Sequence, residues 1–569
     1  MNPDAGTIVA ACQAIILQIF MRKTSIALLV SLLLTVPMGA QGFLKGKILC
    51  FDAEKGVAER GGTSFTLALP GGLSSSSTLS LLSVERALEK AADDDEIAMV
   101  FLRPDQISAS QAIREELRSS LERFAAKGKP VVCYGISFST ASYYLGSVGD
   151  RVFLHPGSEG NLTGPSSTQL YYKDLLDSLG IRVQLIRHGS YKSAGEPYVR
   201  SEMSPENRQQ YEVLLGSIWA PMVEEMAASR GIAADSLRNW VATLQLATSQ
   251  DWLDKGLVDG LKYRDEMEDY LCHLFGKTDP AELKRVSMSD YVKSLKKKGS
   301  SKVAVLYAEG DIVRSGSGIA GEKFARQIAK VRADSSVKAV VLRVNSPGGE
   351  VVAADMIRRE IELLRKDKPV VASYGAYAAS GGYLISVGAD RIFVDNATLT
   401  GSIGVFGQVI SFGDALKTKL HINPFTVGTH EHSDMSSGVR PLDEKELAWY
   451  QGTIDGIYDD FVQVVCDGRG MERAAVDSLA QGRVWSGADA LKIGLADERG
   501  ILLDAVHAAA ERAGLKKYRI VAYPEKKNLM DELLSQDKEK ESPLVRIREI
   551  LPSGYSTIAR MPYIEIDKP

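Results

Sequence analysis

The chain of 569 residues has few cysteines and histidines and no long basic block. Its five cysteines are scattered and form no Cys-x-x-Cys pair, so neither a zinc site nor a disulfide framework is indicated. A net charge of −4 without a basic cluster argues against nucleic acid as a partner. His430 and His432 lie together in "VGTHEHSD" without a third clustered ligand, so we expect a polar loop, no metal and no cofactor.

Two apolar segments stand at the amino terminus. Residues 8–20 are too short to cross a bilayer comfortably, because a spanning helix needs about 20 residues. Residues 21–42 have a basic start, an apolar stretch and small residues ending near Ala40, as an export signal does. We expect residues 1–40 to be a cleaved export signal or a retained anchor, with a hairpin-like anchor of both segments as a third option. The functional body then lies outside the cytoplasm, and Met21 is an alternative start.

The body of the chain contains an internal repeat. The stretch "KPVVCYGISFSTASYYLGSVGDRVF" (129–153) matches "KPVVASYGAYAASGGYLISVGADRIF" (368–393) at KPVV, Tyr-Leu, Ser-Val-Gly and Asp-Arg. Upstream, "EIAMVFLRPD" (96–105) resembles "SVKAVVLRVN" (336–345). The chain is therefore a tandem duplication of one unit.

Strand patterns alternate with helical patterns in both copies, as in "IAMVFL" followed by "SASQAIREELRSSLERFAAKGKP". This alternation predicts an α/β fold with parallel sheets wound with helices. The length suits two to four domains, and 45% hydrophobic with 25% charged residues is typical of a globular chain. We predict a first repeat over 41–284, a helical connector over 285–302, a second repeat over 303–523, and a charged segment with a tail over 524–569. The tail is apolar enough to dock on the body or on a neighbouring subunit.

Ser380, in "YAASGGYLI", stands where an apolar strand is expected to turn into a helix. A serine in that place is either a helix N-cap or a nucleophile. Amides at a helix N-terminus point outward and favour negative charge, so the N–H of Gly381 is a candidate donor to an oxyanion on Ser380. The repeat offset of 239 residues puts Ala141 opposite Ser380, so the first copy lacks the serine.

A second oxyanion donor is expected from "RVNSPGGEVV" (343–352). This stretch follows a buried strand, and it puts Gly348 and Gly349 at the carboxyl end of that strand, where open parallel sheets place their sites. A plain turn is the alternative, since Asn, Ser, Pro and Gly are all turn-prone. The counterpart in the first copy, "RPDQIS", has no glycine. Because the first copy has lost both the serine and the glycines, we favour a functional loop.

A nucleophilic serine needs a base, and no histidine lies within the core motifs. A lysine can serve when burial lowers its pKa, and Lys192 in "RHGSYKSAGEPY" (187–198) is the candidate. The alternative is an ordinary loop lysine. The corresponding part of the second copy, residues 421–439, contains no lysine. The first copy thus keeps the lysine and the second keeps the serine, as expected if a homodimer with shared sites became one chain with one site.

These motifs carry a family resemblance. "AASGGY", "NSPGG", "LTGSIGVFG" (399–407) and "YKSAGEPY" together resemble the long, two-repeat form of signal peptide peptidase A, or protease IV, of bacteria. The resemblance covers about residues 46–523. It implies a unit similar to the Clp protease proteolytic subunit and the crotonases. It also implies a Ser-Lys dyad of Ser380 and Lys192, with Ser402 as a residue that orients the lysine.

The same resemblance implies a location and a substrate. It implies attachment to the inner membrane, with the catalytic body on the periplasmic side, and assembly as a homotetramer. The implied substrates are signal peptides after their release from preproteins. The signal-like start of this chain departs from the family pattern and leaves open whether the anchor is cleaved.

Two other functions share some of these features. A crotonase-like enzyme acting on acyl thioesters has the same alternating pattern and a glycine-rich oxyanion loop, but it needs no serine paired with a buried lysine. A non-catalytic scaffold that binds membrane peptides is the other alternative, since the first copy shows that this unit can lose its chemistry.

Overall fold

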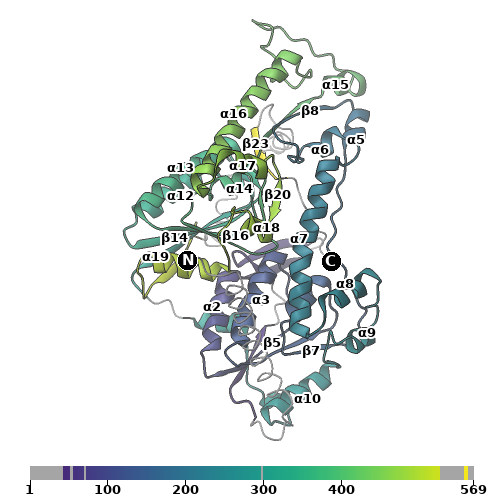
Figure 1. The fold of residues 1–569 in the computed structure, drawn as a ribbon, viewed down its shortest axis with the longest axis vertical. Coiled ribbons are helices and arrows are strands. Elements are labelled where there is room, and N and C mark those ends of the chain that lie inside the picture. The colour runs from purple at the N-terminus through teal and green to yellow at the C-terminus, as the bar shows by residue number, and fades with distance from the viewer. Residues whose placement is uncertain (1–42, 52–55, 69–71, 296–298, 526–556, 562–569) are drawn as a thin grey trace, which may run out of the picture. The chain divides into compact units, whose positions relative to one another are not determined.

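The computed structural model describes residues 43–51, 56–68, 72–295, 299–525 and 557–561 (Figure 1). The apolar segments 8–20 and 21–42 lie outside these residues. The chain forms two compact units. The smaller unit includes residues 265–284, where η2 (Pro280–Glu282) and most of α10 (Arg264–Phe275) lie. The larger unit, 47–264 with 285–569, contains the second predicted repeat and most of the first.

Six parallel strands form the sheet of the first repeat. In spatial order they are β10 (Arg285–Ser287), β1 (Lys47–Phe51), β5 (Ile97–Leu102), β6 (Val131–Gly135), β7 (Arg151–Leu154) and β9 (Gly260–Leu261). The helices and one 3-10 turn of this half are α2 (Leu81–Ala92), η1 (Pro104–Gln106), α3 (Gln111–Ala125), α4 (Thr140–Gly146), α5 (Lys173–Ser178), α6 (Glu196–Val199), α7 (Pro205–Arg230), α8 (Ala234–Ala242), α9 (Ser249–Asp254) and α11 (Met288–Ser294).

The sheet of the second repeat has the same order of parallel strands. Its strands are β22 (Arg519–Tyr523), β11 (Lys302–Glu309), β14 (Val337–Ser346), β16 (Val370–Ala379), β17 (Arg391–Val394) and β21 (Glu498–Arg499), extended from β16 by β18 (Leu399–Gly401) and β20 (Val484–Ser486). The helices are α12 (Gly321–Ala333), α13 (Val351–Asp367), α14 (Gly381–Leu384), α15 (Gly413–Lys419), α16 (Glu444–Arg469), α17 (Arg473–Leu479), α18 (Gly487–Lys492) and α19 (Leu502–Arg512).

The matching strand orders show the predicted duplication in three dimensions. They also redefine the segment 285–302, which we expected to be a helical connector. Its first residues form β10, and α11 follows directly. Strand β10 is the edge strand beside β1 in the first sheet, as β22 is the edge strand beside β11 in the second. Burial explains the order, because the central strands of both sheets are runs of Val, Ile, Leu and Ala with helices on them, as parallel strands require.

A third sheet joins the two repeats. Its order is β13 (Ile319–Ala320), β12 (Ile312–Val313), β15 (Gly348–Glu350), β23 (Thr557–Arg560), β19 (Phe406–Ser411) and β8 (Arg182–Arg187). Strand β8 of the first repeat pairs antiparallel with β19 of the second over six residue pairs. A small sheet of β2 (Val57–Ala58), β4 (Gly72–Ser80) and β3 (Gly62–Ala68) lies in the first repeat.

Buried carboxylates also hold the two repeats together. Arg343 of β14 pairs with Glu59 at 2.7 Å and with Glu116 of α3. Glu116 also accepts the backbone N–H of Leu502 at 2.6 Å, and Glu85 accepts that of Leu503 at 2.9 Å. These are the first amides of α19, so carboxylates of the first repeat satisfy a helix N-terminus of the second.

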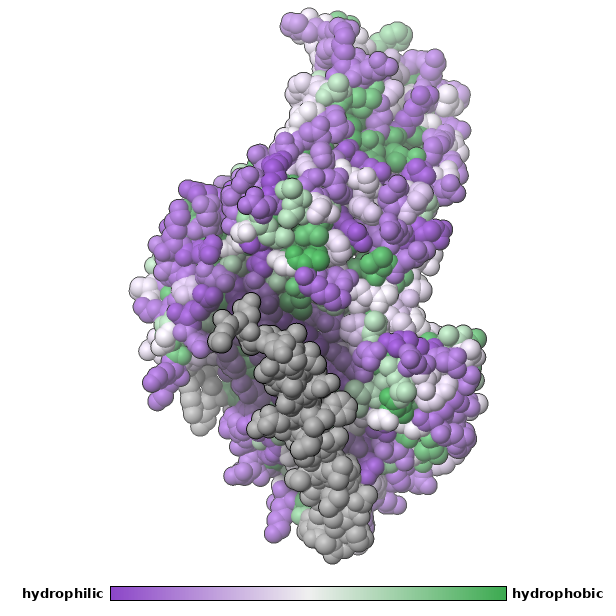
Figure 2. All heavy atoms as spheres, viewed as in Figure 1, coloured by the Kyte–Doolittle hydropathy of each residue, from purple (hydrophilic) through white to green (hydrophobic). Residues whose placement is uncertain are grey.

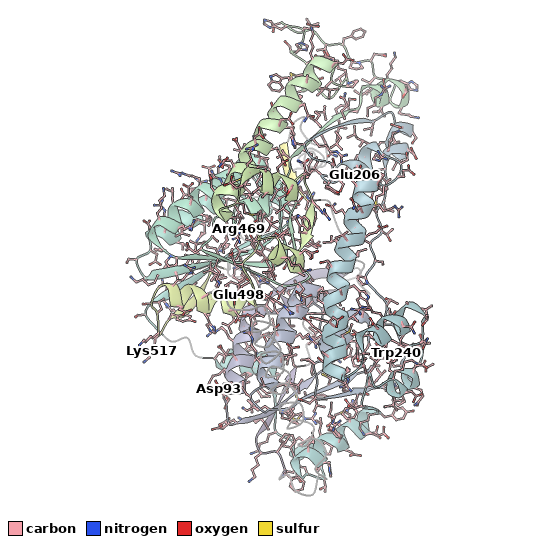
Figure 3. All side chains as sticks on the ribbon, viewed as in Figure 1. Asp93, Glu206, Trp240, Arg469, Glu498 and Lys517 are labelled. Atoms are coloured by element: carbon pink, nitrogen blue, oxygen red, sulfur yellow. The ribbon has the colours of Figure 1, made fainter. Side chains whose placement is uncertain are left out.

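Two helices of 26 residues, α7 and α16, are the longest of the described residues. Helix α7 begins after the N-cap Ser204 with Glu206 in its first turn, and α16 ends with Arg469, which donates to Asp497 and to the Gly494 carbonyl (Figure 3). Neither is a membrane span, since no helix among the described residues is long and apolar enough to cross a bilayer.

The surface carries exposed hydrophobic side chains near α5 and α15. Figure 2 shows hydrophobic side chains gathered near the top of the view, where Figure 1 labels β8 and α5. The turn after α5 contacts α15, because the N–H of Ala415 donates to the carbonyl of Gly180 at 3.0 Å. The large exposed apolar side chains of α5, of the turn after it and of the segment after α15 are Leu175, Leu179, Leu420, Ile422, Phe425 and Val427, and we call this set the apolar arm surface.

Candidate active site

Ser380 lies at the end of the long strand β16, immediately before α14. Its φ of 55° and ψ of −117° are a strained backbone conformation for a residue with a side chain. Its hydroxyl makes no capping hydrogen bond to the helix. The helix-cap alternative therefore does not account for this serine.

The lysine reaches the serine from the other repeat. Lys192 follows β8, and the pairing of β8 with β19 carries it into the second repeat. Its Nζ lies 2.8 Å from Ser380 Oγ, and both side chains are fully buried. The two residues that reciprocal loss had paired are thus brought together within one chain.

The Lys192 amine lies within hydrogen-bonding distance of three oxygen atoms, and none of them belongs to a carboxylate among the residues that the structure describes. Burial holds the pKa of Lys192 well below its ordinary value. Besides Ser380 Oγ, Nζ lies 2.9 Å from the carbonyl oxygen of Ser402 and 3.0 Å from Ser402 Oγ. A neutral amine has two N–H groups and one lone pair. If the amine is neutral and both N–H groups donate to Ser402, its lone pair faces Ser380 Oγ.

The glycine-rich loop lies beside the serine. Strand β15 packs against α14, and Ser346 pairs with Ala378 near the end of β16. Gly348 and Gly349 have φ values of 103° and 156°. A Cβ at Gly349 would lie 1.9 Å from the Ile312 carbonyl oxygen, so only glycine fits there.

Gly381 follows Ser380 as the first residue of α14, where backbone amides lack partners within the helix. Its neighbour Gly382 packs on the end of β14, because a Cβ there would lie 2.5 Å from the Ser346 carbonyl oxygen. The second glycine of "SGG" therefore serves packing. Of the predicted donors, Gly381 follows Ser380 directly, and Gly348 and Gly349 lie in β15, which packs against α14. The N–H of Gly348 donates to Ser346 Oγ at 3.2 Å.

The tail residues 557–561 dock on the body next to this site. Strand β23 lies antiparallel to β15 on one side and to β19 on the other, with Arg560 opposite Gly348 and Ala559 opposite Gly349. The N–H of Met561 donates to the Pro347 carbonyl at 2.8 Å, and the Met561 side chain is buried. A segment of this chain thus lies extended along the glycine-rich loop.

Sequence reasoning missed the loop over residues 480–483, which contacts both Lys192 and Ser402. Its "AQGR" reads as an ordinary turn, and none of its residue types marks chemistry. A sequence signal was present in the Gln-Gly pair ahead of a short strand, but turns of that kind are common.

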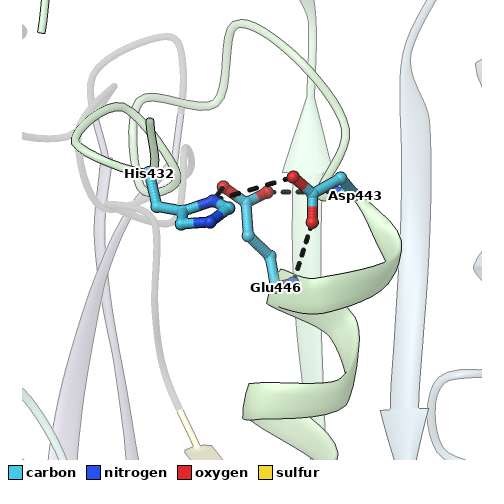
Figure 4. Close-up of side chains that lie close together, drawn as sticks. All are labelled: His432, Asp443 and Glu446. Carbon is cyan, nitrogen blue, oxygen red and sulfur yellow. Dashed lines mark hydrogen bonds and ion pairs between the residues drawn. The ribbon is translucent and has the colours of Figure 1, made fainter. Parts of the chain in front are cut away.

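His432 lies near two carboxylates, Asp443 and Glu446 (Figure 4). Asp443 and Glu446 form the capping box of α16, and Arg440 donates to Glu446 at 2.7 Å. The Arg440 guanidinium lowers the pKa of Glu446 to about 2. These groups are engaged in a helix cap and ion pairs, with Arg440 supplying the positive charge. His430 lies apart from this cluster in the exposed loop.

A serine and a buried lysine at the carboxyl end of parallel strands, next to a glycine-rich loop, are typical of a serine hydrolase. The model of peptidase family S49 matches residues 123–274 and 362–516, once in each repeat. The chain belongs to peptidase family S49, in its long two-repeat form, and it is a serine peptidase.

Relatives match over most of the chain. "Protease 4" of Haemophilus influenzae is 35% identical over 76% of this chain and 73% of its own, and "Protease 4" of Salmonella typhi is 33% identical over 85% and 79%. "Serine protease SPPA, chloroplastic" of Arabidopsis thaliana is 30% identical over 84% and 73%. Among solved structures, a point mutant of ClpP1 from Listeria monocytogenes matches with a TM-score of 0.24 and 14% identity, covering 36% of this chain and 94% of its own. The family match favours a peptidase over the acyl-thioester alternative.

Proposed function

We propose that this chain is an endopeptidase with Ser380 as nucleophile and Lys192 as general base, acting on cleaved signal peptides and similar apolar peptides. The observation that carries the proposal is the 2.8 Å separation of Lys192 Nζ and Ser380 Oγ in a fully buried setting. The S49 membership and the printed names of the relatives support it.

The reaction begins with proton transfer. The neutral Lys192 amine takes the hydroxyl proton as Ser380 Oγ attacks the peptide carbonyl carbon. The negative charge that develops on the carbonyl oxygen is held by the amide of Gly381 and by an amide of Gly348 or Gly349. The ammonium then gives its proton to the leaving amine as the C–N bond breaks. A water molecule, deprotonated by the same lysine, releases the acyl group and restores the hydroxyl.

Peptides bind as an extended strand in this account. Strand β23 shows that the space between β15 and β19 accepts a strand with backbone pairing on both sides. Such pairing reads the backbone rather than a particular side chain, so an unfolded segment fits where a folded domain does not. The buried side chain of Met561 beside this strand favours an apolar residue in the peptide.

The proposal includes attachment to the inner membrane with the body on the periplasmic side, and assembly as a homotetramer. The signal-like residues 21–42 support the location. The apolar arm surface supports assembly, because Phe425 and Val427 are 92% and 99% exposed and monomeric proteins rarely leave such groups of side chains in water.

Turnover of an apolar fluorogenic peptide tests the dyad. Ser380→Ala and Lys192→Ala should each lower kcat by about a thousandfold or more, since removing one member of a catalytic pair disables the whole. Lys127→Ala, which removes a half-exposed lysine just after α3 and its ion pair with Asp93, is the matched control and should retain activity. Substantial turnover by either dyad variant would refute the proposal, and binding without turnover by the native chain would support the scaffold alternative.

A further inference from the structure

The loop over residues 480–483 connects α17 to β20 and lies against the segment that carries the lysine. The N–H of Tyr191, the residue before Lys192, donates to the carbonyl of Gln481 at 3.0 Å. This bond links a loop of the second repeat to the backbone of the first repeat, one residue from the proposed base.

The same loop holds Ser402. The backbone N–H of Ser402 donates to the carbonyl of Arg483 at 2.7 Å, and Ser402 Oγ donates to the carbonyl of Gly482 at 3.3 Å. Ser402 in turn supplies both oxygen atoms that accept from the Lys192 amine. One loop therefore contacts the lysine backbone and the group that orients its amine.

Glycine is required where the loop passes the lysine. Gly482 has a φ of 78°, and a Cβ there would lie 2.5 Å from the Cβ and 2.7 Å from the backbone nitrogen of Lys192. A Cβ at Gly404 would lie 2.7 Å from the Cα of Gly482 and 3.3 Å from the Cδ of Lys192. The lysine side chain thus passes between the backbones of Gly404 and Gly482, which carry no side chains.

Side chains away from the serine fix the loop. The Arg483 guanidinium lies over two rings, 5.2 Å from the centre of Tyr191 and 4.2 Å from that of Trp485. Gln481 Nε2 donates to the hydroxyl of Tyr458 at 3.2 Å and to Asp477 at 3.1 Å. Neither side chain contacts Ser380 or the amine, so their effect on catalysis acts through the backbone.

We propose that Gly482 and Arg483 are positioning residues for the general base. A lysine side chain has four rotatable bonds, so an amine held within hydrogen-bonding distance of a hydroxyl needs a fixed stem. The 480–483 loop fixes that stem by backbone contact at Gly482 and by the stacking of Arg483 on the ring of Tyr191. The inference rests on the proposed Ser-Lys chemistry and adds the part of the second repeat that places the lysine.

Gly482→Ala tests the contact, with Gly494→Ala as the matched control. Gly494 has the same φ of 78° but no atom within 4 Å of the added Cβ, so both variants put a Cβ at the same positive φ and only one displaces Lys192. Cleavage of a fluorogenic apolar peptide is measured across pH. In Gly482→Ala, kcat should fall about tenfold or more with KM nearly unchanged. The midpoint of its rising pH limb should move toward that of an ordinary lysine, and Gly494→Ala should behave as the native chain does.

Arg483→Gln keeps the inference testable if Gly482→Ala does not fold, as judged by thermal melting beside Gly494→Ala. It removes the guanidinium stacked on Tyr191 and leaves the loop backbone intact, so kcat should fall about three- to tenfold with the same pH shift. Arg483→Lys should recover part of the loss.

Labelling of native Ser380 with a fluorophosphonate, measured by intact mass, distinguishes failure of the proposed function from failure of the positioning role. If Ser380 is not labelled and peptide is not cleaved, the proposed function itself fails. If Ser380 is labelled but the folded Gly482→Ala, or in its place Arg483→Gln, matches the native kcat and pH midpoint, the positioning role is overturned.

Discussion

At the scale of single residues, the proposed chemistry depends on the Lys192 amine, because burial lowers its pKa well below the ordinary value. Lys192 is fully buried, and no acidic side chain in the part of the chain that the structure describes pairs with it, so folding shifts its equilibrium toward the neutral form. In the proposed neutral form, its two N–H groups donate to Ser402, which leaves one acceptor position for Ser380. The proposed chemistry thus rests on the burial of the amine and on the number of its donors and acceptors.

Glu115 provides a residue-scale prediction for stability. It is fully buried on α3 and accepts the N–H of Ala397 from the second repeat. The titratable groups that interact with it include Glu225, Asp395, Tyr144 and Arg499. Burial raises the pKa of Glu115 to about 7. Because the folded pKa lies above the unfolded one, this group's contribution to stability is complete below about pH 4.5. It is lost as the pH rises through about 7.

Glu115→Gln should therefore flatten the fall in stability between pH 5 and pH 8, since the amide keeps the acceptor without the titration. The difference should be on the order of 1–3 kcal/mol in the free energy of unfolding. Urea unfolding at both pH values measures it, with the exposed Glu212→Gln as control. Equal pH dependence in native chain and variant would show that Glu115 titrates in its ordinary range.

At the scale of elements, β23 occupies the strand position proposed for the substrate. Removing residues 557–569 should raise kcat/KM for a short apolar peptide by about tenfold, because a tethered strand competes at a high effective concentration. The measurement is peptide cleavage by the shortened chain. A synthetic peptide of residues 555–563 added back should inhibit it. Unchanged cleavage with no inhibition by the peptide would place the substrate elsewhere.

Part of the fold and of the candidate site could be predicted from the sequence. The offset between "YYLGSVGDRVF" and "YLISVGADRIF", with Ala141 opposite Ser380, predicted the duplication and the serine at a strand end. Loss of complementary residues predicted that Lys192 belongs with Ser380. The sequence did not predict how Lys192 reaches Ser380, because β8 pairs with β19, a strand more than 200 residues away. Pairing partners at that separation leave no local pattern.

The contacts of the 480–483 loop with the site could not be predicted from the sequence, for a different reason. Its contribution to the site comes from main-chain carbonyls and from a missing Cβ at Gly482, and neither depends on a residue type that marks chemistry. Similarly, the start of the predicted connector proved to be strand β10. Three residues are too few for a periodicity, and only the match with β22 in the second sheet explains their place.

At the scale of the whole molecule, two copies of one unit share one site through a joint sheet and buried ion pairs. The apolar arm surface remains exposed in the single chain, and it is the surface proposed for tetramer contacts. Phe425→Asp together with Val427→Asp should lower the mass found by light scattering below four chains, since charge disfavours an apolar contact. Leu244→Asp, at an exposed apolar residue after α8, should leave the mass unchanged. Four chains in the double variant would locate the contacts elsewhere.

The central claim is that neutral Lys192 activates Ser380, and the rate of Ser380 acylation against pH tests it most directly. A serine-directed acylating probe is followed by intact mass, with the modified residue assigned by peptide mapping. The account predicts one label on Ser380, formed at a rate that rises with pH through a midpoint well below that of an ordinary lysine, and no measurable label in Lys192→Ala. Equal rates and equal pH dependence in the native chain and Lys192→Ala would contradict it.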